Sequence, residues 1–133
     1  MIRRLALAAV MLVQSTSLAG AWKGTSICLA RKPICKDEVV VYHFTADSGD
    51  ARSYHVAANK IVGGAEEEMG VLPCRLDDRG TSVSCTMRLG VWTFDVRGDS
   101  LVGGLTLTDG TKVRDVHVRR VPPSPTPNAP GTP

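Results

Sequence analysis

Four cysteines carry the most predictable chemistry in this sequence, which is cross-linking by oxidation. Cys28 and Cys35 have six residues between them, and Cys74 and Cys85 have ten. A zinc site built from four thiolates would want closely spaced Cys-x2-Cys pairs, so this spacing does not favour a metal site. In an exported chain an even number of cysteines predicts two disulfides, although four cysteines permit three connectivities.

Ionisable residues suggest a second kind of site. In the strand alignment given below, Lys60 lies opposite Glu68 and both side chains point inward, where they could bind a polar ligand head group at a half-dry barrel mouth. The alternative is an exposed cross-strand ion pair, worth about 0–1 kcal/mol. Arg114 and Lys112 fall on the same inward phase near a strand end, where they either extend past the rim into solvent or bind an anion.

Residue types that often serve catalysis are present but scattered. His43, His55 and His117 are expected on the outer faces of three separate strands, so we do not expect a shared metal site. No serine lies in a Gly-x-Ser-x-Gly elbow, and pairing of all four cysteines leaves no thiol nucleophile. We therefore predict a protein without enzymatic activity, bound metal or cofactor.

The two ends of the chain differ in composition from its middle. Arg3 and Arg4 precede an aliphatic run at 5–13 and an Ala-Gly-Ala sequence at 19–21, a pattern typical of a secretory signal peptide. We expect cleavage after Ala21, with Ala19 as an alternative; nine apolar residues are too few to anchor the chain across a ~30 Å hydrocarbon core. The prediction is a signal peptide at 1–21, one domain at 22–121 and a disordered, proline-rich tail at 122–133.

Charge and hydropathy exclude further classes of function. Loss of the signal peptide lowers the formal net charge from +3 to +1, with basic and acidic residues interspersed along the chain. A nucleic-acid-binding protein would show a basic stripe, and no other segment is long enough to span a membrane. We expect a monomer in the periplasm or outside the cell.

Turn signals predict how the later strands pair. Hairpins centred on residues 109–110 and 98–99 both assign the same three residues to one apolar face: Leu101, Gly103 and Leu105. A tight turn at residues 89–90 places Cys85 opposite Phe94. A hairpin through residues 78–81 places Cys74 directly opposite Cys85, within reach of a disulfide.

The earlier strands extend this pattern to a complete architecture. Strands are expected at 22–29, 38–45 and 53–62, and a three-residue hairpin at 63–65 leads into a strand at 66–76. Cys28 and Cys35 would close a local loop. Eight antiparallel strands predict an all-β, up-and-down barrel with two disulfides, because closure removes both sheet edges. A two-layer β-sandwich is the alternative.

A resemblance supports the barrel. A chain that opens on Trp22, Lys23 and Gly24 and continues as a β-meander with a bulky apolar interior resembles the lipocalin-like (calycin) barrels. The patterns W-x-G-T-S-x-C, C-x-D-E-V-V-V-Y, M-G-x-L-x-C and G-x-W-T-F-D-V also resemble small exported bacterial proteins of unassigned function. The chain is far shorter than a lipocalin and lacks the long helix that follows the lipocalin barrel. The resemblance implies the fold, and ligand binding as one function that this fold serves.

Two functions are compatible with this sequence. In the first, a small apolar ligand binds at the barrel mouth, near Tyr54, Lys60, Glu68, Trp92 and Arg114. In the second, the barrel is a secreted protein–protein interaction module such as a protease inhibitor. An empty cavity of roughly a few hundred Å³ would favour the ligand. A filled core with an exposed apolar patch or a protruding loop would favour the protein partner.

Overall fold

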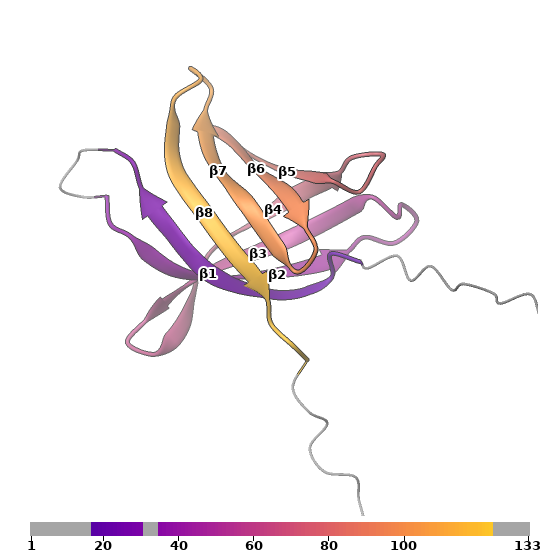
Figure 1. Cartoon of the computed structure of the whole chain (residues 1–133), viewed down its shortest axis with the longest axis horizontal. Coiled ribbons are helices and arrows are strands. Elements are labelled where there is room, and N and C mark those ends of the chain that lie inside the picture. Colours follow the sequence, from indigo (N-terminus) through magenta and orange to yellow (C-terminus); the bar gives the residue numbers. More distant parts are fainter. Residues whose placement is uncertain (1–16, 31–34, 124–133) are drawn as a thin grey trace, which may run out of the picture.

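The computed structural model describes residues 17–30 and 35–123, and all the regular elements in these residues are β-strands. Each strand pairs antiparallel with the next and β8 pairs with β1, which closes an up-and-down barrel (Figure 1). The barrel prediction is therefore confirmed over the sandwich. The strands are β1 (Gly20–Cys28), β2 (Glu38–Ala46), β3 (Ser53–Val62), β4 (Ala65–Leu76), β5 (Ser82–Met87), β6 (Gly90–Arg97), β7 (Ser100–Leu107) and β8 (Lys112–Arg120).

The chain ends fall partly outside this description. The predicted signal peptide lies outside the described residues up to position 16, and the predicted tail does so from position 124. Within the described part, β1 begins at Gly20, two residues before the predicted start of the domain. The described residues contain no helix long and apolar enough to cross a membrane.

Alternation of apolar and polar residues accounts for the core. In β2, every second side chain from Val40 through Tyr42 to Phe44 is buried, because successive side chains in a strand point to opposite faces. The rings of Tyr42, Trp92 and Phe94 pack with centroids 6.0–6.5 Å apart. The space left among these rings is a cavity of about 20 Å³, so side chains fill the interior.

Both predicted disulfides are present, Cys28–Cys35 and Cys74–Cys85. The second joins residues that face each other directly across β4 and β5, as the predicted alignment requires. Disulfides persist in oxidising compartments, so the pair indicates a protein that folds in an oxidising environment.

Two hairpins depart from the predicted register. The β5–β6 turn consists of residues 88–89, so Cys85 pairs with Trp92 instead of Phe94. This shift of two residues leaves every side chain on its predicted face, because side-chain direction repeats every two residues. The β3–β4 turn has two residues instead of three, Gly63 and Gly64, at φ 57° and 82°. A type I′ hairpin turn needs positive φ at both positions, which glycine adopts without strain.

This shorter turn moves the acidic residues of β4 relative to β3. Lys60 pairs with Glu67, and Glu68 lies opposite Asn59 on the outer face, so the predicted Lys60–Glu68 pair was wrong. An extra residue at Met69 forms a β-bulge, and beyond the bulge the predicted pairing of Tyr54 with Cys74 is confirmed.

Candidate functional site

The barrel has two dissimilar ends, and the strand directions decide which residues lie at each. One end, called the mouth here, carries the β3–β4, β5–β6 and β7–β8 turns and the Cys28–Cys35 disulfide. The opposite end, called the terminal end, carries residues 17–21, the end of β8 and the remaining turns. Tyr54 is the second residue of β3, at the terminal end, whereas Lys60 lies seven positions after Ser53, near the mouth.

Arg114 is a largely enclosed charged side chain at the mouth, with 16% of its side chain exposed. Its Nη1 donates to Ser26 Oγ at 3.0 Å and to the carbonyl oxygen of Lys36 at 3.2 Å, and its Nη2 lies 3.9 Å from Glu38 Oε1. Arg114 therefore ties β8 to β1 and to the segment after Cys35. These partners use much of the donor capacity of the guanidinium group. Arg114 is therefore better suited to hold these segments together, a role called a latch here, than to bind an anion.

The buried phenol of Tyr42 lies within reach of the charge of Arg114. Burial raises the pKa of Tyr42 well above its usual value, and the nearby charge of Arg114 acts in the opposite direction. The phenol therefore stays protonated at neutral pH and offers no general base. Trp92 and Arg114 approach the same region, since Leu105 is paired with Trp92 on one side and with Arg114 on the other.

An apolar groove opens beside the mouth, where β4 separates from β5. The two strands pair over only three residues of β4, at 74–76, and β5 ends at Met87. Residues 65–72 of β4 therefore pair with β3 on one side. On the other side they pair with no strand among the described residues, so this edge of β4 is open. This edge groove has a volume of about 140 Å³ and is lined by Ala58, Met69, Gly70, Leu72, Met87 and Trp92.

The β3–β4 hairpin beside this groove exposes three large apolar side chains. Val62, Met69 and Val71 are 49%, 46% and 54% exposed, and Figure 1 shows the hairpin projecting from the rest of the barrel at lower left. Three exposed carboxylates stand beside these side chains: Glu66, Glu67 and Glu68. The hairpin thus presents apolar and acidic side chains together.

A polar cluster ties Glu66, which lies near the tip of the hairpin, to the barrel wall. Glu66 Oε1 lies 2.6 Å from His43 Nε2 and accepts a hydrogen bond from Asn59 Nδ2 at 3.2 Å. These bonds, that with His43 first, hold the pKa of Glu66 below its usual value. The carboxylate therefore links β4 to β2 across β3 and fixes the direction in which the hairpin leaves the barrel.

A serine, a histidine and an aspartate also meet at the terminal end. Ser53 Oγ donates to Asp47 Oδ2 at 2.5 Å, and His55 Nδ1 lies 2.6 Å from Asp47 Oδ1. The aspartate stands between the other two, so the serine hydroxyl contacts a carboxylate instead of the imidazole that would have to activate it. The bonds with Ser53 and His55 lower the pKa of Asp47. The cluster orders the β2–β3 loop.

The five residues predicted to bind a ligand do not form one site. Trp92 lines the edge groove, Arg114 latches the mouth, and Glu68 lies on the outer face. Tyr54 is buried at the terminal end, far along β3 from Lys60. The sequence analysis did not predict the edge groove. The unequal lengths of the fourth and fifth strands could have indicated it, because a short strand cannot pair with the whole of a long one. Among the residues described, no three potential metal ligands gather into a site.

Comparison with known proteins gives no further guide: no protein-family model, curated protein or solved structure matches this chain.

Proposed function

We propose that this chain is a protein-binding barrel that takes an extended segment of its partner along the open edge of β4. The observation that carries this proposal is the edge itself, at residues 65–72, which pairs with β3 and not with β5. A strand with an open edge offers backbone N–H and C=O groups to an added strand, a recurrent mode of peptide recognition.

The side chains around the edge support the same proposal. Val71 and Met69 offer apolar contact on an exposed element, and the edge groove beside them can take a partner's side chain. The interior is a poor alternative, because a space of about 20 Å³ has room for little more than one water molecule.

Charge indicates the chemistry of the partner. Three successive exposed carboxylates, Glu66 to Glu68, stand along the edge, and only Glu67 has a basic residue, Lys60, opposite it on β3. A partner segment that alternates aliphatic residues with lysine or arginine would match both the groove and this charge. The disulfides and the expected signal peptide support a periplasmic or secreted location for the interaction.

Selection of random nine-residue peptides displayed on phage against the oxidised barrel tests the proposal. We expect the selected peptides to alternate aliphatic and basic residues. Met69→Lys and Val71→Lys should each weaken binding about tenfold, because each adds charge to the apolar contact. Val39→Lys is the matched control: Val39 is 43% exposed on β2, away from the edge, and its replacement should leave the affinity unchanged. Binding that ignores both edge variants would contradict the proposal.

A small apolar ligand in the edge groove is the second candidate, since the groove shares Ala58, Leu72 and Trp92 with the inner cavity. Native mass spectrometry of protein purified from its own compartment tests it. A stoichiometric co-purifying small molecule that quenches Trp92 fluorescence would favour the ligand over the peptide.

A further inference from the structure

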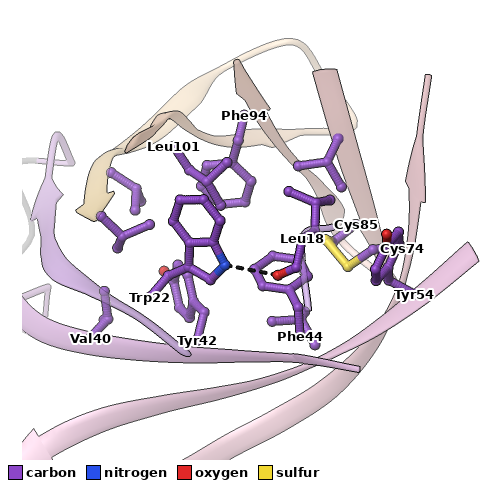
Figure 2. Close-up of a cluster of buried hydrophobic side chains, with 14 residues drawn as sticks. Leu18, Trp22, Val40, Tyr42, Phe44, Tyr54, Cys74, Cys85, Phe94 and Leu101 are labelled. Atoms are coloured by element: carbon purple, nitrogen blue, oxygen red, sulfur yellow. Dashed lines mark hydrogen bonds between the residues drawn. A yellow bond between two sulfur atoms is a disulfide. The ribbon is translucent and has the colours of Figure 1, made fainter. Parts of the chain in front are cut away.

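Residues 17–19 close the terminal end of the barrel from within. Leu18 is 2% exposed and belongs to the main core cluster, and Figure 2 shows its carbonyl oxygen facing the indole of Trp22. Trp22 is fully buried, and its Nε1 donates to Leu18 O at 3.0 Å. The aliphatic side chain of Leu18 therefore fills a hole in the core, while its backbone satisfies a buried donor.

Two more side chains bind the same segment. Arg120 Nη2 donates to Ser17 O at 2.8 Å and Nη1 donates to Ala19 O at 3.2 Å. The guanidinium group lies over the Trp22 ring, 4.3 Å from its centroid. Tyr54 Oη lies 3.2 Å from Ser17 Oγ. Side chains from β1, β3 and β8 thus converge on three successive residues and meet all three carbonyl oxygens.

These contacts define a socket for a peptide: a hole for one aliphatic side chain, with donors spaced for the carbonyl oxygens of that residue and its two neighbours. The chain's own residues 17–19 occupy it. These residues lie on the N-terminal side of both expected signal-peptidase cleavage points, after Ala19 and after Ala21. Hydrolysis of the peptide bond after either residue adds the hydroxyl of water to the carbonyl carbon and its hydrogen to the released nitrogen. It would remove Leu18 and leave the donors facing an open hole.

We propose that this socket is a second peptide-binding site, filled by residues 17–19 in the whole chain and opened by signal-peptide cleavage. The opened socket takes a leucine-like side chain between small residues from a partner protein. The socket lies at the opposite end of the barrel from the β4 edge, and its occupancy does not depend on binding there.

The test uses the full chain with Leu18→Asp, which places a charge in the apolar hole and expels the internal segment without truncation. The probe is a fluorescent, capped peptide with the sequence of residues 15–21, Ser-Thr-Ser-Leu-Ala-Gly-Ala. Fluorescence anisotropy should show the variant binding this peptide at least about tenfold more tightly than the unaltered chain. A peptide with aspartate in place of the leucine should bind neither. Equal binding to both chains, or binding to neither, would overturn the proposal.

Two further measurements cover a failure of Leu18→Asp to fold. Leu18→Gly removes the side chain without adding charge and should also bind the peptide. The mass of the exported protein should correspond to a chain that begins at Gly20 or at Trp22. This cleaved form should bind the peptide without any substitution. An exported protein that retains Leu18, or one that lacks it and does not bind, would overturn the proposal. Arg120→Gln should weaken peptide binding about tenfold while leaving peptides selected for the β4 edge unaffected.

Discussion

The disulfide between Cys74 and Cys85 joins the last paired residues of β4 and β5 before the two strands separate toward the mouth. One covalent bond thus stands at the inner end of the edge groove. Cys85 is also among the residues that line the inner cavity, so the bond contacts both the core and the split in the wall. The groove can stay open because the strands beside it are clamped at that point.

The disulfide predicts a loss of stability when it is removed. Replacing both Cys74 and Cys85 with alanine should lower the free energy of unfolding by about 3 kcal/mol, because the unfolded chain is released from a short closed loop. Urea denaturation measures this loss. The barrel wall should also open further at the groove, which an apolar dye would detect. Replacing Cys28 and Cys35 is the control, since it should lower stability without increasing dye binding at the groove. A loss below about 1 kcal/mol for the first pair would contradict the prediction.

Two glycines form a matched test of packing between strands. A side-chain carbon at Gly103 would overlap the carbonyl oxygen of Thr93, whereas one at Gly70 would meet open space in the groove. Gly103→Ala should therefore cost about 1–3 kcal/mol of unfolding free energy by forcing the backbone to move. Gly70→Ala should change it by less than about 0.5 kcal/mol. Thermal or urea unfolding compares the two, and equal effects would show that the close approach of β6 and β7 is not what requires Gly103.

Because Arg114 holds segments of the mouth together, its removal should lower stability and loosen the segment after Cys35. Arg114→Ala should lower the unfolding free energy by about 1–3 kcal/mol, because the buried hydroxyl of Ser26 loses its partner. Arg119→Ala, on the exposed face of the same strand, should cost less than about 0.5 kcal/mol. Hydrogen exchange should also speed up in the segment around Lys36, which Arg114 holds. Unchanged exchange there, together with unchanged stability, would count against a latch.

Protonation of Glu66 predicts a pH dependence of stability. The bonds from His43 and Asn59 lower the pKa of Glu66 in the folded protein below its ordinary value of 4.5. The unfolded chain then binds a proton at higher pH than the folded chain, so this stabilisation is fully present above pH 4.5 and is lost as pH falls through the lower folded pKa. Glu66→Gln should flatten the fall in unfolding free energy over this window, as urea denaturation at a series of pH values would measure.

Glu67→Gln is the control for this experiment, because Glu67 is exposed and pairs with Lys60 across the strands without a close ion pair among the described contacts. It should leave the pH profile nearly unchanged. If both substitutions flatten the profile alike, the effect belongs to the net charge of the hairpin and not to the bonds of Glu66.

Apart from residues 66–68 of β4, the sequence alone determined which face of each strand is buried, and through that the barrel. Leu101 lies opposite Val118, and Cys74 opposite Cys85, as turn signals and apolar alternation predict. This inference succeeds because side-chain direction repeats every two residues, so an error of two in a turn, as at Cys85 and Trp92, changes partners without changing faces.

Only the tertiary structure decided where the barrel opens and where it closes. A turn one residue shorter than predicted, offset by the bulge at Met69, moved Glu68 to the outer face, because the two arrangements differ only in local backbone geometry. The overhang of β4 follows from where β5 ends. Residues 17–19 close the terminal end through hydrogen bonds from Trp22 in β1 and Arg120 in β8, which lie at opposite ends of the domain sequence. Such contacts depend on the closure of β1 onto β8, which the pattern within each strand does not encode.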